Sequence, residues 1–423
     1  MENRRPFSPK AEGYIISAVG NSLRPLSAQD RKGQLSTWLV LFSVLTIGVG
    51  QSMTFALLAP LGREVGFGEI QIGLIISCSA LTFTLTSPAW GRNSDRWGRK
   101  PVLLLGLFGY TFGCALFATS FYLGLKGLLT GALLYLSAIG SRVLMASLMS
   151  AAPGAASAYI ADTTTLEQRV AGMGRLGAAR TLGAILGPTL CGLLATLGLL
   201  APLYIAAGIT LIGAILVAVV LREPPQTVSH QAPKSRLKLF DKRYFPYILI
   251  GFLTFFAFSM VSQTIGFYLQ DRFVLDGKAT AQALGFGMGV SALMSLFSQA
   301  YLVSRMKLSP IRLLNSGLPV LLCGYALLLI VNSIALVAMC LGIVGLGLGM
   351  VAPAFTAGAS LAVGADEQGA TGGLTSACPA AGFVLGPLIG TSLYQIQPTL
   401  PFLSACVLML PLIIYAWRFG KTV

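Results

Sequence analysis

Charge is scarce in this chain. Of its 423 residues only 10% are Asp, Glu, Lys or Arg, whereas soluble proteins carry about 25%. Hydrophobic residues make up 55%, and apolar stretches repeatedly exceed the roughly 18 residues that mark a membrane-spanning helix. The composition therefore excludes a soluble globular protein. Lipid offers no hydrogen bonds to the backbone, so the spans must be helices or a closed barrel, and continuous apolar runs favour helices.

The sequence also lacks the motifs of several enzyme classes. A G-x-x-x-x-G-K-[ST] phosphate-binding loop is missing, because Gly420-Lys421-Thr422 has Tyr at position 415 where the first glycine would stand. There is no H-E-x-x-H motif, no C-x-x-C pair among the seven cysteines, and only one histidine, His230. We therefore predict that the chain is not an enzyme, binds no metal and uses no cofactor.

The formal net charge of +15 does not indicate a nucleic-acid partner, because the basic residues are unevenly placed. Of the 29 Lys and Arg residues, 23 fall on one side of the predicted spans. This bias places both termini in the cytoplasm of a cell whose inner membrane the chain crosses. Four basic residues fall on the other side and two inside spans: Arg63, Lys126, Arg272 and Lys278, then Arg142 and Arg180.

We expect twelve membrane-spanning helices. The predicted spans cover residues 36–62, 69–91, 101–123, 131–161, 170–194, 202–221, 244–269, 280–303, 311–331, 334–361, 369–395 and 399–418. The predicted fold is an all-α integral membrane protein with four parts: a cytoplasmic tail over 1–35, a six-helix bundle over 36–221, a cytoplasmic linker over 222–243 and a second six-helix bundle over 244–420.

The two predicted bundles share a G-x-x-x-G-P motif. The fifth span contains Gly183-x3-Gly187-Pro188-x3-Gly192, and the eleventh contains Gly382-x3-Gly386-Pro387-x2-Gly390. The two prolines are 387 − 188 = 199 residues apart. Pro153 and Pro353, in the fourth and tenth spans, are 353 − 153 = 200 residues apart. These nearly equal offsets predict that the second bundle repeats the structure of the first.

A charged island, Gly91-Arg92-Asn93-Ser94-Asp95-Arg96-Trp97-Gly98-Arg99-Lys100-Pro101, lies between the second and third spans. It can be read as a short cytoplasmic turn. The order of its residues also resembles the loop G-x-x-x-D-R-x-G-R-K between helices two and three of the major facilitator superfamily. The matching residues are Gly91, Asp95, Arg96, Gly98, Arg99 and Lys100. The resemblance implies a transporter whose two six-helix halves rock about a site near the middle of the membrane.

By the same resemblance the island is a conformational latch on the cytoplasmic side. Asp95 would meet the N-terminus of the eleventh span near residues 369–373, where the helix dipole favours an anion. Arg99 would pair with Asp162 at the inner end of the fourth span. The corresponding loop of the second half, residues 305–310, has no acid, so the latch would be one-sided.

The G-x-x-x-G-P motif of the fifth span resembles the signature of the drug:proton antiporter branch of this superfamily. Its glycines allow helices to approach closely, and its proline removes one backbone hydrogen bond. The motif can be a packing seam only, or a hinge and seal where the halves rock. The residues of this candidate hinge are Gly183, Gly187, Pro188, Gly382, Gly386 and Pro387.

Two arginines inside predicted spans are candidate substrate ligands, since a charge there is costly. Arg142 aligns with the R-x-x-x-G motif of the superfamily's fourth span, with Ala146 in place of the glycine. Arg180 lies near mid-membrane and shares a helix face with Gly183 and Gly187. Its guanidinium either extends toward a backbone carbonyl or faces the central cavity, where it could bind a carboxylate; we prefer the second interpretation.

No carboxylate lies deep in any span, since all 14 Asp and Glu residues fall in loops or at span ends. Proton-coupled drug exporters of the resembled branch commonly carry such an acid. The departure favours an anionic or zwitterionic substrate over a cationic drug. If protons are coupled, they must be carried by Glu64, Glu69, Asp95, Asp162 or the substrate itself.

Uncharged polar residues complete the predicted substrate site. In the superfamily the first, fourth, seventh and tenth spans line the cavity, which favours residues of the first and seventh. These are Gln51, Thr54, Gln263 and Tyr268. Each could instead bond a neighbouring helix inside the bundle.

The predicted function is proton-coupled export of a small organic compound, leaning toward an anionic metabolite, siderophore or drug. The expected partners are this substrate, the lipid bilayer and protons, with the chain acting as a monomer. Uptake or exchange of a small organic anion uses the same scaffold and stays an alternative. A non-transporting membrane receptor or assembly factor would need a soluble domain or a long tail, which the sequence lacks.

Overall fold

The structure is a computed structural model that describes residues 28–164, 166–224, 241–303, 305, 308–364 and 367–420. In these ranges the regular elements are all helices. They are α2 Ala28–Glu64, α3 Glu69–Trp97, α4 Arg99–Leu125, α5 Gly131–Met149, α6 Ala151–Thr163, α7 Leu166–Leu194, η1 Ala195–Leu197, α8 Ala201–Val220, α9 Phe245–Phe273, α10 Gly277–Phe297, η2 Ser298–Val303, α12 Pro310–Leu327, α13 Ile334–Leu361, α14 Gln368–Ile396 and α15 Leu400–Phe419.

Twelve helical spans in the described residues are long and apolar enough to cross a membrane. The predicted all-α membrane fold and its number of spans are therefore confirmed. Two spans are less regular than predicted. The fourth, Gly131–Thr163, is interrupted at Ser150, because Pro153 has no N–H to donate to the carbonyl of Met149. The eighth ends in a π-helix, η2.

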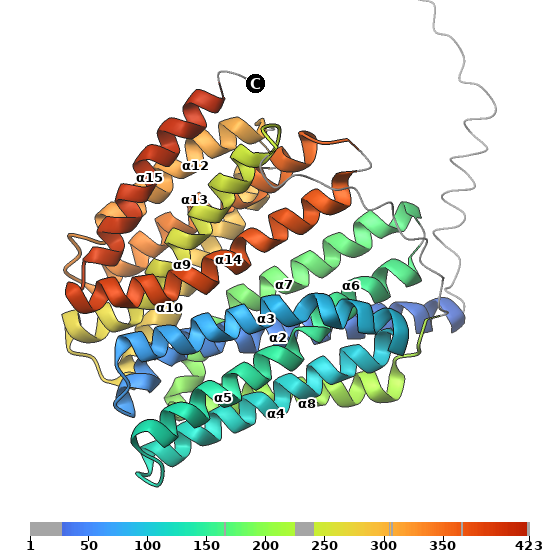
Figure 1. Cartoon of the computed structure of the whole chain (residues 1–423), viewed down its shortest axis with the longest axis horizontal. Helices are drawn as coiled ribbons and strands as arrows, with labels where there is room; N and C mark the ends of the chain where they lie inside the picture. The colour runs from blue at the N-terminus through green and yellow to red at the C-terminus, as the bar shows by residue number, and fades with distance from the viewer. Residues whose placement is uncertain are drawn as a thin grey trace, which may run out of the picture.

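Helices α2–α8 pack together, and so do helices α9–α15 (Figure 1). We call these groups the first and second halves. They meet where α3 packs against α14 and where α7 packs against α10. The two contacts correspond under the predicted duplication, since they join the second span of each half to the fifth span of the other. Most of the predicted tail and linker, 1–35 and 222–243, lies outside the described residues.

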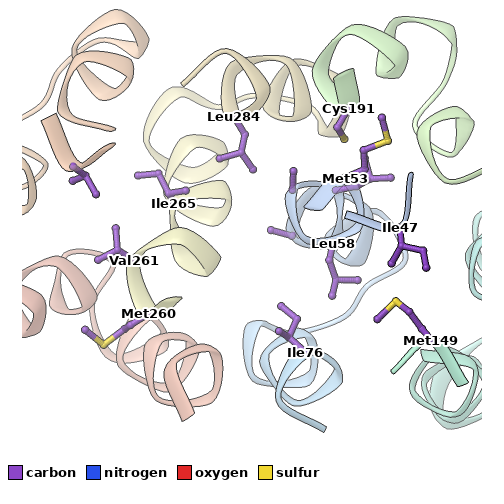
Figure 2. Packing of buried hydrophobic residues seen from close by; sticks show 14 of the residues in the cluster. Ile47, Met53, Leu58, Ile76, Met149, Cys191, Met260, Val261, Ile265 and Leu284 are labelled. Atoms are coloured by element: carbon purple, nitrogen blue, oxygen red, sulfur yellow. The ribbon is translucent and has the colours of Figure 1, made fainter. Parts of the chain in front are cut away.

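Buried apolar side chains continue from one half to the other. Figure 2 shows Met53 of α2 beside Cys191 of α7, Leu58 of α2 near Ile76 of α3, and Ile265 of α9 near Leu284 of α10, all of them members of one buried apolar cluster. Large apolar side chains such as Phe112 and Val219, which are 66% and 78% exposed, lie on the outer surface of the bundle. This distribution is expected where lipid covers the protein.

The two ends of the bundle differ in charge. We call the end that carries residues 91–101 the basic end and the other the Arg63 end. Odd-numbered spans start at the basic end, so α2, α7, α9 and α14 run in the same direction.

Candidate functional site

The glycines of the fifth-span motif hold α7 against α2. A Cβ atom on Gly183 would lie 2.8 Å from the carbonyl oxygen of Leu45, and one on Gly187 would lie 2.5 Å from that of Val49. The Ser52 hydroxyl donates to the Gly183 carbonyl at 3.0 Å. Only glycine permits this approach, so the motif packs two helices of the first half together.

The second copy of the motif makes the equivalent contact in the second half. A Cβ atom on Gly382 would lie 2.8 Å from the backbone of Phe255, and one on Gly386 would lie 3.0 Å from the backbone nitrogen of Met260. Both partners belong to α9. The duplicated sequence pattern therefore corresponds to a duplicated helix contact.

The prolines of the two motifs face the opposite half. A Cβ atom on Gly285 of α10 would lie 2.6 Å from the carbonyl oxygen of Pro188, and one on Gly73 of α3 would lie 3.0 Å from that of Pro387. The first two glycines of each motif thus pack within their own half, whereas the proline of each motif, and Gly192 of the first, pack against the other half. Gly73 and Gly285 lie in no motif that sequence analysis singled out.

Arg180 lies on the face of α7 that is directed between α2 and α10. Successive residues of a helix are about 100° apart, which places Arg180 between the direction of the α2 contacts and that of the α10 contacts. Its side chain is exposed. The lipid-facing side of α7 is on the opposite side of the helix and carries the exposed residues Leu182, Leu186 and Leu193.

Arg180 has no acidic partner among the described residues, where the ion pairs are formed by Arg63, Arg99 and Arg243. An arginine near the middle of a membrane costs about 3 kcal/mol. An unpaired guanidinium that is exposed between the two halves can bind the carboxylate or phosphate of a ligand through two parallel hydrogen bonds.

Arg142 lies in a different environment, because its side chain is completely buried. Its Nη2 donates to Oε1 of Gln51 at 3.3 Å, so the structure brings together two of the predicted site residues. The guanidinium also lies 5.4 Å from the ring centre of Phe55 and 5.8 Å from that of Phe117. Within the described part of the chain its Nε has no hydrogen-bond partner.

Phe55 connects this buried cation to the second half. Its ring stacks on Phe383 of α14 with ring centres 5.7 Å apart, and Phe383 contacts Phe258 of α9 at 6.4 Å. Sequence analysis did not single out these aromatic residues, since phenylalanines are common in every apolar span. Arg142 and Gln51 could be found because a charge or an amide inside an apolar span is rare, whereas a phenylalanine there is not.

Three other predicted ligands are buried. Thr54 is 1% exposed and donates to the Gly50 carbonyl of its own helix at 2.8 Å. Gln263 is 6% exposed, and Tyr268 is 5% exposed with its ring against Phe402 of α15. Thr54 stands one turn after Gln51 on α2, whereas no hydrogen bond or ring contact among the described residues joins Gln263 or Tyr268 to Gln51 or Arg142.

The charged island forms a cluster within the first half. Arg99 donates to Asp162 at 2.8 Å, which is the predicted pair, and also to Asp95 at 2.6 Å. Glu223, at the start of the predicted linker, accepts hydrogen bonds from the backbone N–H groups of Arg99 and Lys100 at the start of α4. Sequence analysis missed this cap, because 124 residues separate Glu223 from Arg99.

The predicted contact between Asp95 and α14 is not made in this conformation. The Asp95 side chain is 62% exposed, and Cβ atoms on Gly91, Gly372 and Gly373 would have open space around them. At the start of α14, Arg243 donates to Glu367 at 3.1 Å. This hydrogen bond lowers the pKa of the Glu367 carboxyl. Arg243 also pairs with Asp241 at 2.7 Å, so it offsets the charge of only one of these two acids.

Polar contacts at the Arg63 end cross between the halves. Arg63 of the first half pairs with Asp271 of the second, and Gln395 of α14 donates to Glu69 of α3 at 3.1 Å. Among the described residues of the basic end, the ion pairs instead join residues of the same half. The two halves are thus fastened at one end of the bundle.

Residues 40–387 match the model of the Major Facilitator Superfamily. The chain belongs to the Major Facilitator Superfamily. This family transporter is 27% identical over 382 residues to "Multidrug resistance protein 1" of Bacillus subtilis, covering 89% of this chain and 94% of the relative. It is 29% identical over 284 residues to "Tetracycline resistance protein, class B" of Escherichia coli, covering 64% of this chain and 66% of the relative.

A solved structure shares the transporter's fold. It is a bacterial homologue of the human lysosomal transporter Spinster in an inward-facing and occupied conformation. The TM-score is 0.71 at 12% sequence identity, with 92% of this chain and 97% of that chain covered. The resemblance predicted from the island and the duplicated motif is confirmed, and so is the prediction that the chain is a transporter rather than an enzyme. Among the described residues no group of His, Cys, Asp and Glu could hold a metal ion.

Proposed function

We propose that this transporter exports a small organic anion across the inner membrane by alternating access, and that Arg180 binds the anionic group. The observation that carries the proposal is the position of Arg180: exposed, directed between the halves and without an acidic partner among the described residues. A cationic substrate would be repelled there, whereas a carboxylate would remove the cost of the unpaired charge.

The rocking units are residues 36–221 and 244–420, joined by the linker 222–243. Both termini lie in the cytoplasm, which puts the basic end on the cytoplasmic side. In this orientation the cross-half contacts close the outer side, and the site is reached from the cytoplasm. The chain acts as a monomer, because each half supplies the partner surface of the other.

Export is supported by the names of the relatives, which are resistance proteins for drugs and tetracycline. A membrane-embedded acid would favour a cationic substrate, and this chain has no such acid. The absence of the acid supports the preference for an anion. The substrate is a metabolite, a carboxylate-rich siderophore or an acidic drug. Protons drive export in exchange, and in the absence of a deep carboxylate they are carried by acids at the span ends or by the substrate.

Transport by purified protein in liposomes tests this function. We expect anions such as citrate or benzoate to be taken up into inside-out vesicles when the interior of the vesicles is more acidic than the outside. We expect no uptake of tetraphenylphosphonium. Arg180→Ala should lower anion transport at least tenfold, since it removes the bidentate contact. Arg175→Ala is the matched control, because Arg175 is an exposed arginine of the same helix on its lipid-facing side.

Transport of tetraphenylphosphonium by the wild type, unchanged in Arg180→Ala, would exclude the anionic substrate. Anion transport that is unaffected by the pH gradient would leave the substrate class intact and exclude proton coupling. Movement of the anion only in the opposite direction would favour uptake over export.

A further inference from the structure

We infer that Arg63 is the residue that fastens the two halves at the outer side, and that its contact with Asp271 breaks in every transport cycle. The inference rests on the proposed alternating access and adds to it the residues that hold one of the two end states. It concerns a cluster of side chains that belong to none of the motifs of the family resemblance.

Arg63 stands in the last turn of α2 and contacts one acid from each half. Its Nη2 donates to Glu69 of α3 at 2.5 Å. Toward the second half the contact is bidentate: Nη1 donates to Oδ1 of Asp271, and Nη2 donates to Oδ2 at 2.9 Å. The guanidinium also lies 4.9 Å from the ring centre of Phe267 of α9.

Helix α14 supports both acids. The Tyr394 hydroxyl donates to Oδ2 of Asp271 at 2.6 Å, and the Gln395 amide donates to Oε2 of Glu69 at 3.1 Å. A further hydrogen bond joins the halves nearby: the Glu64 carboxylate accepts from the backbone N–H of Gly277, at the start of α10, at 3.1 Å. The cluster therefore joins α2 and α3 of one half to α9, α10 and α14 of the other.

This bridge is stronger than an ordinary surface ion pair. Surface pairs contribute little because water competes for both charges, and the Asp271 side chain is 44% exposed, but the Arg63 side chain is only 22% exposed and binds Asp271 through two hydrogen bonds. Arginine binds a carboxylate bidentately in a planar geometry, which fixes orientation as well as distance. The contact thus opposes separation of the halves at this end.

The two acids differ in a way that makes the bridge reversible. Glu69 belongs to the same half as Arg63, whereas Asp271 belongs to the other half. When the halves separate at this end, Arg63 loses Asp271 and keeps Glu69. The guanidinium is never left without a counter-charge, so opening costs the energy of one ion pair rather than that of a bare charge.

A structural role alone would look different. If Arg63 only stabilised the turn between α2 and α3, its partner Glu69 would be sufficient, and removing Asp271 would change the stability of the fold without favouring either end state. A shift between end states therefore distinguishes the bridge from a local structural contact.

Hydrogen–deuterium exchange of the full-length protein in nanodiscs, read by mass spectrometry, makes this test. Asp271→Asn keeps the shape of the side chain and removes its charge. We expect faster exchange in peptides covering 57–72 and 388–397 and slower exchange in peptides covering 91–101, with the ratio of the end states changed about tenfold. Tyr394→Phe removes the hydrogen bond that the Tyr394 hydroxyl donates to Asp271. It should change the exchange rates of the same peptides in the same directions, by a smaller amount.

Asp276→Asn is the matched control. Asp276 is an exposed acid at the same end and in the same half as Asp271, but its side chain caps its own helix α10 by accepting from the N–H of Ala279 at 2.6 Å. Asparagine caps a helix as well as aspartate does, so exchange should stay at the wild-type level at both ends.

Unchanged exchange in Asp271→Asn and in Tyr394→Phe would overturn the inference, as would faster exchange at both ends together, which indicates destabilisation. The proposed substrate is tested separately. Anion transport that depends on Arg180 can coexist with unchanged exchange in Asp271→Asn, in which case only the bridge is excluded.

Discussion

The side chain of Arg142 is a buried charge whose surroundings are aromatic and amide groups rather than acids. Such a group is expensive to keep in an apolar interior. Replacing a buried charged network by an apolar residue of similar size is often neutral or stabilising. We therefore propose that the charge at position 142 serves transport rather than stability.

Arg142→Met tests this explanation, because methionine fills irregular space without a charge. We expect the thermal unfolding midpoint of the purified variant to stay within a few degrees of wild type or to rise. Anion transport in liposomes should fall at least tenfold, because the guanidinium that contacts Gln51 and Phe55 is no longer present. A large drop in the midpoint together with normal transport by the remaining folded protein would show that the charge is structural.

The ion pair of Arg243 and Glu367 has a pH dependence whose sign follows from the structure. Because the folded-state pKa of Glu367 is lowered below its ordinary value of 4.5, the pair contributes to stability above that value. The contribution is lost as the pH falls through the lowered pKa. We expect Glu367→Gln to unfold at a slightly lower temperature than wild type at pH 7, and this difference to shrink steadily as the pH is lowered below 4.5. A difference that does not shrink as the pH falls would assign the effect to the amide rather than to the charge.

At the scale of helices, the repeated G-x-x-x-G-P motif has two functions. Its glycines hold the fifth span of each half against the first, and its proline carbonyl packs against a glycine of the opposite half. In the proposed rocking motion, the second contact would be lost when the Arg63 end opens. A side chain at Gly73 or Gly285 should therefore destabilise the closed end without disturbing either half.

Gly285→Ala tests this element. The added Cβ atom would lie 2.6 Å from the Pro188 carbonyl oxygen, and overpacking of this kind costs about 1–3 kcal/mol. We expect the neighbouring Cys191, which is buried, to react faster with a membrane-impermeant maleimide than in wild type. Gly208→Ala is the control, because a Cβ atom there has open space around it. Equal reaction rates in both variants would contradict a gating role for the glycine contact.

The helices themselves could be predicted because a membrane span leaves a local signal, an apolar run bounded by charge. The interruption at Ser150 was missed because Pro153 lies three residues further on, and other prolines, such as Pro60 of α2, lie within helices that continue. The pair Arg99–Asp162 was predicted from the resemblance, whose motif includes Arg99. The bridge between Arg63 and Asp271 joins residues that are 208 positions apart, and neither belongs to a motif. Sequence analysis could place both at span ends and could not pair them.

For the whole molecule, the two ends form alternative contacts. The described conformation has the cross-half bridge at the Arg63 end, while Asp95 at the basic end is bound to Arg99 of its own half. We propose that closing the basic end brings Asp95 to the N-terminus of α14, as the latch predicts. Each end state then has its own charged contact, and the balance between them is small enough to be shifted by a ligand.

Asp95→Asn should shift this balance toward the described conformation, because an amide interacts more weakly with the helix dipole than a carboxylate. We expect a lower exchange rate than wild type in peptides at the Arg63 end and a higher rate at the start of α14. Arg92→Gln, a change of charge in the same island, is the control. An unchanged exchange pattern in Asp95→Asn would exclude the latch while leaving the outer bridge untouched.

In the proposed alternating access, the two halves rock so that one end opens as the other closes. Two distances in the same protein test it most directly, measured by electron paramagnetic resonance with labels carried on unnatural amino acids at exposed positions. One pair, at Lys126 and Lys278, spans the Arg63 end, and the other, at Arg175 and Arg312, spans the basic end. On going from wild type to Asp271→Asn, the first distance should lengthen and the second should shorten. Two distances that lengthen together, or that do not change, would contradict alternating access by rocking of these halves.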